Sequence, residues 1–233
     1  MPRTAPLPGY LRIAEVVTRD ISAGRLVDGQ RLPPERQMAG DLGVAVGTLR
    51  KALAELEQRG LLIRRQGSGN YIREGSGPQG IYALFRLELL TGGGLPTAQV
   101  LSVDRLAKPA DLPEFGSGPD AHRIRRLRLL SGIPASVEEI WFCASHAARM
   151  DRAALSESLY LHYRQQFGLI IARAEDRIAQ APLPDWSPPE FPRPPGTALP
   201  VVLRLSQTGA GRVVEISRNW FDPDVAQYVV RLT

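Results

Sequence analysis

The sequence predicts a two-domain α+β protein, with a small helical domain followed by a larger domain built on antiparallel strands. Apolar residues recur at helical spacing in the first third of the chain, and short β-prone runs bounded by turn residues fill most of the rest. Between these parts lies Glu74-Gly-Ser-Gly-Pro-Gln-Gly80, which has no apolar residue. We therefore expect domains over residues 1–73 and 81–233, joined by a linker over 74–80.

The composition is typical of a globular protein, and the distribution of charge predicts that the first domain binds an anionic partner. The 233 residues carry a net charge of +5, and residues 1–74 hold twelve Lys and Arg against eight Asp and Glu. A basic excess in one domain is typical of nucleic-acid binding. The single cysteine, Cys143, excludes an intrachain disulfide, and no apolar run is long enough for a signal peptide or a membrane span. We expect a soluble, cytoplasmic protein with no membrane partner.

Three helices are predicted in the first domain. A first helix ends at Gly24 and places Glu15 off its buried stripe; its apolar residues are Ile13, Val16, Val17 and Ile21. A short second helix follows the prolines of Leu32-Pro-Pro-Glu-Arg36 and ends at Leu42-Gly43. The third helix covers about Val46 to Arg59, with Leu49, Leu53 and Leu56 on its buried face and Gly60 after its end.

A hairpin completes the first domain. Leu61–Ile63 and Asn70–Ile72 are β-prone and flank the glycine-rich tip Arg64-Arg-Gln-Gly-Ser-Gly69. Helix, short helix, turn, longer helix and hairpin are typical of a winged helix-turn-helix, whose third helix fits the major groove of double-stranded DNA. We expect DNA contacts from Arg36, Thr48, Arg50 and, in the wing, Arg65. For any one of these arginines, an ordinary solvated surface charge is the alternative.

The second domain is predicted to be mostly strands with one helix over residues 155–167. The expected strands are 81–89, 97–106, 123–130, 135–142, 169–179, 199–207, 212–221 and 227–232. Turns at Ser131-Gly132 and at Thr208-Gly-Ala-Gly211 predict hairpins, which favours an antiparallel α+β architecture over a doubly wound sheet. The proline-rich stretch from Pro182 to Pro200 is expected to be irregular.

Two arginines in the second domain are candidates for binding a small ligand. Arg126 and Arg128 lie on one face of a predicted strand, and Glu138 follows on its neighbour. Guanidinium groups bind carboxylate or phosphate bidentately, and a glutamate accepts from ammonium or hydroxyl groups, so an anionic or zwitterionic ligand is expected. An exposed cross-strand ion pair without a ligand is the alternative.

The first domain resembles the DNA-binding domain of the GntR family. The resemblance rests on Leu32-Pro-Pro-Glu-Arg36, Thr48-Leu-Arg-Lys-Ala-Leu53 and Arg65-Gln-Gly-Ser-Gly-Asn-Tyr71. It implies operator contacts by Arg36, Thr48, Arg50, Gln66 and Gly67. The family usually has Ser-Arg-Thr where this chain has Ala45-Val46-Gly47, so a capping hydroxyl and a base-reading arginine are absent.

The second domain resembles the UTRA effector domain of HutC-type members of that family. The matching motifs are Arg126-x-Arg128, Gly132-x-Pro134, Glu138, Ser158-Leu-Tyr160 and Val214-Glu-x-Ser217. The resemblance implies a chorismate-lyase-like fold, a homodimer, and a small-molecule effector. The implied ligand contacts are Arg126, Arg128, Glu138, Glu215 and Ser217.

Together these observations predict a DNA-binding transcriptional regulator that responds to a small anionic or zwitterionic metabolite. The resemblance to the family implies that it is a repressor. The alternative is a lyase-like enzyme tethered to a weak DNA-binding module. Catalytic motifs are missing from the sequence, and His122, His146 and His162 have no metal-ligand spacing. We therefore expect no catalytic residue, metal or cofactor.

Overall fold

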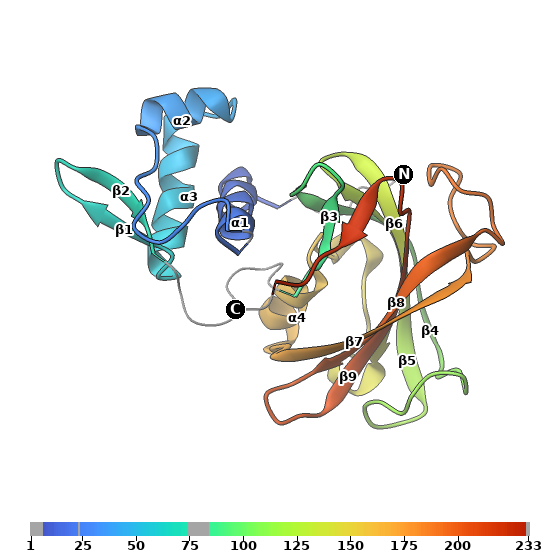
Figure 1. Cartoon of the computed structure of the whole chain (residues 1–233). Helices are drawn as coiled ribbons and strands as arrows, with labels where there is room; N and C mark the ends of the chain where they lie inside the picture. The colour runs from blue at the N-terminus through green and yellow to red at the C-terminus, as the bar shows by residue number, and fades with distance from the viewer. Residues whose placement is uncertain (1–6, 23, 74–83, 232–233) are drawn as a thin grey trace. The chain divides into compact units, whose positions relative to one another are not determined.

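A computed structural model describes residues 7–22, 24–73 and 84–231, which form two compact units (Figure 1). One unit is built mainly of residues 7–73, and the other of residues 86–92 and 96–229. The expected linker over 74–80 lies outside the described residues, so the limits of the two domains stay a prediction. Among the described residues, no helix is long and apolar enough to cross a membrane.

The N-terminal unit contains the expected three helices and hairpin. Its elements are α1 (Gly9–Ser22), α2 (Glu35–Asp41), α3 (Val46–Gln58), β1 (Leu62–Arg65) and β2 (Gly69–Ile72). Gly24, Gly43 and Gly60 follow the three helices with φ between +63° and +73°, a conformation that suits glycine after a helix. β1 and β2 pair antiparallel from Leu62 with Ile72 to Arg65 with Gly69. The predicted winged helix-turn-helix is confirmed.

The helices of this unit pack around one apolar core, with one exception to the expected pattern. Leu49, Leu53 and Leu56 of α3 are fully buried, as their spacing predicts. Glu15 was expected off the buried stripe, and that expectation is wrong, because its side chain is completely buried. An ion pair with Arg59 compensates its charge, and Arg59 also donates to Glu55 at 2.8 Å. The basic partner therefore allows a carboxylate between α1 and the end of α3.

The C-terminal unit is built on a six-stranded sheet in the order β4-β5-β6-β9-β8-β7, with every neighbouring pair antiparallel. The strands of this sheet are β4 (Pro96–Ala107), β5 (Asp120–Leu130), β6 (Ile133–Cys143), β7 (Arg173–Pro182), β8 (Ala198–Gln207) and β9 (Val213–Phe221). A separate two-stranded sheet pairs β3 (Leu87–Leu89) with β10 (Ala226–Tyr228). The antiparallel α+β prediction is confirmed.

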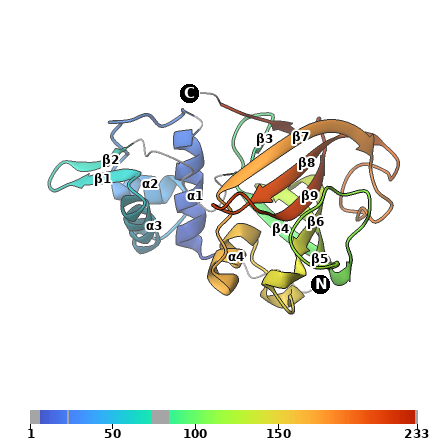
Figure 2. The same ribbon diagram turned by 90° about the horizontal axis from the view of Figure 1, so that it is seen from below.

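Different segments cover the two faces of the six-stranded sheet. Helix α4 (Leu159–Phe167) lies on one face, where Leu159 and Tyr163 pack against Ile124 and Phe142 (Figure 2). The proline-rich segment packs on the opposite face, where Phe191 is buried with Trp220. Residues 183–197 contain no helix or strand, as expected, but the two ends of the predicted irregular stretch belong to strands, Pro182 to β7 and residues 198–200 to β8. Because successive side chains of a strand point to opposite faces, alternate residues pack against α4 and against the proline-rich segment.

Several element bounds differ from the expectation. The helix expected over 155–167 begins only at Leu159, because the hydroxyl of Ser158 caps it by accepting from the Leu161 amide at 3.3 Å. The strand expected over 81–89 is a strand only at β3, and residues 81–83 lie outside the described residues. Two short 3-10 helices, Ala144–His146 and Arg152–Ala154, connect β6 to α4. Neither helix was predicted, because each has only three residues and is too short to show a helical period of apolar residues.

Candidate functional sites

The exposed side of α2 and α3 carries three of the predicted DNA contacts. Arg36 lies in the first turn of α2 and is exposed, Thr48 is half-buried near the start of α3, and Arg50 is exposed. Leu49 and Leu53 anchor the opposite side of α3 in the core. The helix therefore holds these polar groups on a rigid support.

Arg50 has a partner that the sequence reasoning missed. Its Nε donates to Glu35 Oε2 at 2.7 Å, and 64% of the Arg50 side chain is exposed. The hydrogen bond from Arg50 lowers the pKa of Glu35. Arg64 donates to the backbone carbonyl of Arg50 at 3.1 Å. Because exposed ion pairs contribute only about 0–1 kcal/mol, Arg50 can exchange this carboxylate for another acceptor at little cost.

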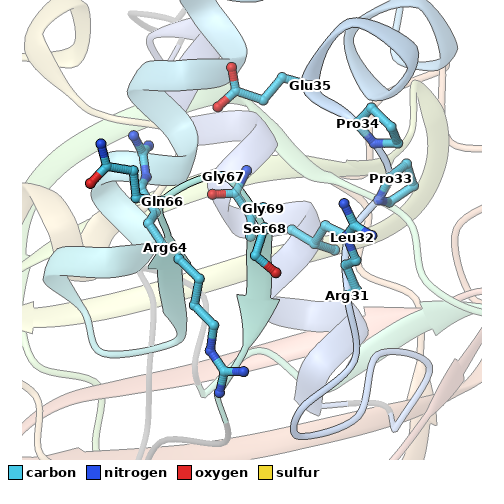
Figure 3. A pocket seen from close by; sticks show the side chains of 12 residues that line it. Arg31, Leu32, Pro33, Pro34, Glu35, Arg64, Gln66, Gly67, Ser68 and Gly69 are labelled. Atoms are coloured by element: carbon cyan, nitrogen blue, oxygen red, sulfur yellow. The ribbon is translucent and has the colours of Figure 1, made fainter.

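The tip of the wing lies beside the segment that leads into α2. A cleft of about 550 Å³ separates them, lined on one side by Arg31 to Glu35 and on the other by Arg64 to Asn70 (Figure 3). Arg65, Gln66 and Gly67 are exposed there. The guanidinium carbon of Arg65 lies 4.7 Å from the centre of the Tyr71 ring, which orients its side chain. The predicted wing residues thus share one surface with the segment that leads into the second helix.

The start of α3 lacks a side-chain cap. Ala45 occupies the N-cap position with φ −67° and ψ 142°, and no side chain bonds the first-turn amides. Val46 packs partly into the core. The absence of a capping hydroxyl, expected from Ala45-Val46-Gly47, is thus visible in the backbone geometry.

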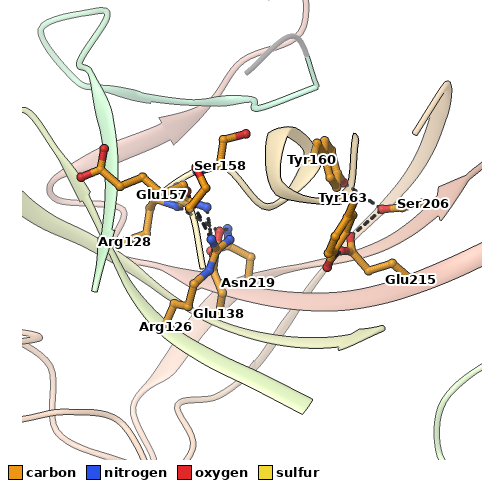
Figure 4. A network of polar contacts seen from close by, with 11 residues as sticks. Arg126, Arg128, Glu138, Glu157, Ser158, Tyr160, Tyr163, Ser206, Glu215 and Asn219 are labelled. Carbon is orange, nitrogen blue, oxygen red and sulfur yellow. Dashed lines mark hydrogen bonds and ion pairs between the residues drawn. The ribbon is translucent and has the colours of Figure 1, made fainter. Parts of the chain in front are cut away.

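A second candidate site lies on the α4 face of the six-stranded sheet (Figure 4). Arg126 lies directly opposite Glu138, and Arg128 lies two residues further along β5 on the same face. Arg126 donates to Glu138 Oε2 from Nε at 3.0 Å and from Nη2 at 2.6 Å. Arg128 donates to Oε1 from Nε at 3.2 Å and to Oε2 from Nη2 at 3.1 Å. The prediction that the three residues lie together is confirmed.

This cluster is buried, so the alternative of an exposed cross-strand ion pair is wrong about the exposure, although the ion pairs between the two strands are present. Arg126, Arg128 and Glu138 are 3%, 4% and 6% exposed. Burial raises the pKa of Glu138, but the two guanidinium groups outweigh that effect and lower its pKa to about 2. Two cations thus share one carboxylate, which is ionised at neutral pH, in a site shielded from water.

Two further residues hold the cluster, and neither was predicted. Nη1 of each arginine donates to the backbone carbonyl of Glu157 at 3.2 Å, and Asn219 Nδ2 donates to Glu138 Oε1 at 3.1 Å. Asn219 lies opposite Glu138 in the strand register, and its position two residues beyond Ser217 was a usable sequence signal. The contact at Glu157 could not be predicted from the sequence, because it uses a backbone carbonyl, which every residue has.

Glu215 belongs to a separate polar network on the same face. Its Oε2 accepts from the Tyr163 hydroxyl at 2.6 Å, and its Oε1 accepts from Ser206 Oγ at 2.8 Å. The Tyr160 hydroxyl lies 2.8 Å from Ser206 Oγ. Burial raises the pKa of Glu215, in contrast to Glu138, whose pKa is lowered. The tyrosines of α4 were not predicted as site residues, although their spacing of three residues places them on one side of a helix.

Ser217 lies between the two networks on β9. It is half-buried and stands opposite Ile140 of β6 and Arg204 of β8. The predicted ligand residues therefore share one face of the sheet, with an arginine–glutamate cluster at one end and a tyrosine–glutamate network at the other. Such a face offers guanidinium donors for an anion and hydroxyl and carboxyl groups for neutral polar atoms. Among the residues the structure describes, no group of three or more His, Cys, Asp or Glu side chains is arranged to hold a metal ion.

Comparison with known proteins identifies a family for each of the two domains. Residues 9–72 match the family described as bacterial regulatory proteins, gntR family, and residues 92–227 match the UTRA domain. The chain is 58% identical over 226 residues to the HTH-type transcriptional regulator SmoD of Agrobacterium fabrum strain C58, with 97% of each chain covered. It is 27% identical over 236 residues to the mannosyl-D-glycerate transport/metabolism system repressor MngR of Escherichia coli strain K12, with 93% and 92% covered.

A solved structure supports the same fold. The possible transcriptional regulator YydK from Bacillus subtilis superposes with a TM-score of 0.56 at 20% identity, covering 97% of this chain and 99% of that one. At this identity the likeness concerns the fold alone.

Proposed function

The chain belongs to the GntR family of bacterial transcriptional regulators and carries a UTRA domain. We therefore propose that it is a repressor whose affinity for its operator is lowered or raised by a small anionic or zwitterionic metabolite. The buried cluster of Arg126, Arg128 and Glu138 is the observation that carries this proposal. Repression is supported by MngR, whose name describes a repressor. The enzymatic alternative is set aside, because the matched families consist of transcriptional regulators.

Operator binding is assigned to the exposed sides of α2 and α3 and to the wing. The proposed contacts are Arg36, Thr48, Arg50, Arg65, Gln66 and Gly67. Helix α3 presents its polar side for the major groove, while the glycines of the wing tip let the backbone approach phosphates. Gly67 has φ +73°, a backbone conformation that favours glycine, and a Cβ added to it would meet no atom of the chain within 4 Å.

The first experiment is selection of duplexes from a random library with the purified full chain, followed by anisotropy titration at several salt concentrations. An enriched inverted repeat, bound far more tightly than a scrambled duplex and with a steep salt dependence, is the expected result. Weak binding without enrichment contradicts operator recognition.

Arg50→Ala tests the recognition helix. Loss of one base contact is expected to weaken operator binding by about 1–3 kcal/mol and to relax specificity at one position in each half-site. Arg177→Ala, which removes an exposed arginine from β7, is the matched control and is expected to bind normally. If Arg50→Ala and Arg177→Ala bind the selected operator equally well, the assignment of Arg50 is wrong.

Effector binding is assigned to the α4 face of the sheet, with Arg126, Arg128, Glu138, Glu215 and Ser217 as the proposed contacts. An anionic group on the metabolite would share the paired guanidinium groups with Glu138, since planar donors of this kind bind carboxylate and phosphate bidentately. The hydroxyl and carboxyl groups at the Glu215 end suit the metabolite's neutral polar atoms. The effector is thus expected to combine an anionic end with hydroxyl or amine groups.

Arg126→Ala tests this site. With the selected operator as a probe, a panel of phosphorylated, carboxylated and zwitterionic metabolites is screened for a change in operator affinity. Arg126→Ala is expected to lose the response while keeping its affinity for the operator. Arg125→Ala is the control, because Arg125 lies on the opposite face and pairs with Glu139 at 2.8 Å. A normal response in Arg126→Ala refutes the ligand role.

A further inference from the structure

We propose that Tyr160, Arg204, Asp176 and Tyr228 form a polar relay that transmits the state of the effector site to the β3–β10 pair. The inference rests on the proposed effector site and names how that site is coupled to the rest of the chain. The relay starts on α4, crosses β8 and β7 on the same face of the sheet, and ends on β10.

The first link joins α4 to β8. The Tyr160 hydroxyl lies 2.8 Å from Ser206 Oγ, and Ser206 donates to Glu215 at 2.8 Å. Arg204 lies two residues before Ser206 on the same face of β8, opposite Ser217 of β9, so Tyr160 and Arg204 stand at neighbouring positions on one side of the sheet. A movement of α4 therefore changes the surroundings of both Ser206 and Arg204.

The second link is an ion pair across β8 and β7. Arg204 lies directly opposite Asp176, and its Nε and Nη2 each donate to one carboxylate oxygen at 2.6 Å. Both side chains are only 14% exposed. A bidentate pair that is largely shielded from water is costly to separate, so the two groups move as one unit.

The third link leaves the six-stranded sheet. The Tyr228 hydroxyl donates to Asp176 Oδ2, so one carboxylate binds both the guanidinium of Arg204 and a phenol from β10. Tyr228 stands opposite Leu87 of β3, and the amide of Val229 donates to the carbonyl of Arg86 at 2.9 Å. Among the residues that the structure describes, β3 is the first strand after β2 along the chain. The relay thus ends at the pair of strands through which the chain enters the effector domain.

The test measures coupling between the two ends of the relay with no ligand or DNA present. Hydrogen–deuterium exchange of the full chain is followed by mass spectrometry in peptides covering 86–90 and 225–229, for wild type, Tyr160→Phe, Tyr228→Phe and the double variant. Each substitution removes one hydroxyl and keeps the ring. Each single variant is expected to speed exchange in these peptides about fivefold, as loss of one hydrogen bond implies. The double variant is expected to be no faster than the faster single variant.

Arg177→Gln is the matched control, because it breaks the exposed Arg177–Glu175 pair on the same strand as Asp176 without touching the relay. Its exchange in the two peptides is expected to equal that of wild type. The relay is overturned if Tyr160→Phe leaves both peptides unchanged, or if the two tyrosine effects multiply in the double variant. Neither readout uses the operator or the effector, so a failed relay and a failed operator selection are separate results.

Discussion

Glu138 and Glu215 are buried carboxyl groups on the same face of one sheet, and their surroundings shift their pKa values in opposite directions. Two guanidinium groups bind Glu138, whereas hydroxyl groups bind Glu215. The pKa of Glu138 is lowered to about 2, and burial raises that of Glu215. The charged partners outweigh burial at Glu138, whereas burial outweighs the hydrogen-bond donors at Glu215.

This difference predicts opposite effects of pH on stability. A lowered folded-state pKa stabilises the protein above the ordinary value of 4.5, and the stabilisation is lost as pH falls from 4.5 toward 2. The shift corresponds to about 3 kcal/mol. Glu138→Gln is therefore expected to be less stable than wild type near neutral pH, with a difference that shrinks below pH 4.5. Urea unfolding at a series of pH values measures this difference.

Glu215→Gln is the control for that series. Because the folded-state pKa of Glu215 is raised, ionisation destabilises the fold as pH rises through the folded value. A neutral amide at this position does not ionise. The free energy of unfolding of Glu215→Gln is therefore expected to increase relative to that of wild type as pH rises. If both variants show the same pH dependence, the two environments do not differ as the geometry indicates.

Among the elements, α3 begins without a side-chain cap. Ala45 has the extended backbone of an N-cap residue but no side chain that accepts a hydrogen bond. Ala45→Ser is expected to raise the free energy of unfolding by about 1 kcal/mol, because a hydroxyl can accept from a first-turn amide. Urea unfolding of the full chain gives the change. Ala45→Val keeps the position apolar and is expected to give no gain; equal stabilisation by both variants would exclude capping as the cause.

Elements that bury a periodic stripe were predicted from sequence, while those fixed by particular contacts were not. The spacing of Leu49, Leu53 and Leu56 was enough to place α3, because burial of one side decides a helix. The start of α4 depends on one hydroxyl of Ser158, and the burial of Glu15 depends on Arg59, 44 residues away. Alternation grouped Arg126, Arg128 and Glu138 correctly. It could not reveal the backbone carbonyl of Glu157, whose position follows from the loop before α4.

At the scale of the whole molecule, the proposed function requires two copies of the chain. A winged helix that reads an inverted repeat needs a second recognition helix related by two-fold symmetry, so we predict a homodimer. Sedimentation of the full chain at micromolar concentration is expected to give the mass of a dimer, and titration is expected to give two chains per inverted repeat. A monomer both in free solution and on the selected operator contradicts the prediction.

Glu138 binds both guanidinium groups from within the chain, and this internal carboxylate bears on which anions the proposed effector site would select. A sensor of anions works among inorganic phosphate and many other small anions, all of which are attracted to arginine. With an internal carboxylate in place, a bare ion gains little by competing, whereas a metabolite that also reaches the tyrosine–glutamate end gains additional bonds. The cluster would therefore make the site selective against small inorganic anions. Transcription would then respond to a metabolite that binds both ends of the site rather than to negative charge alone.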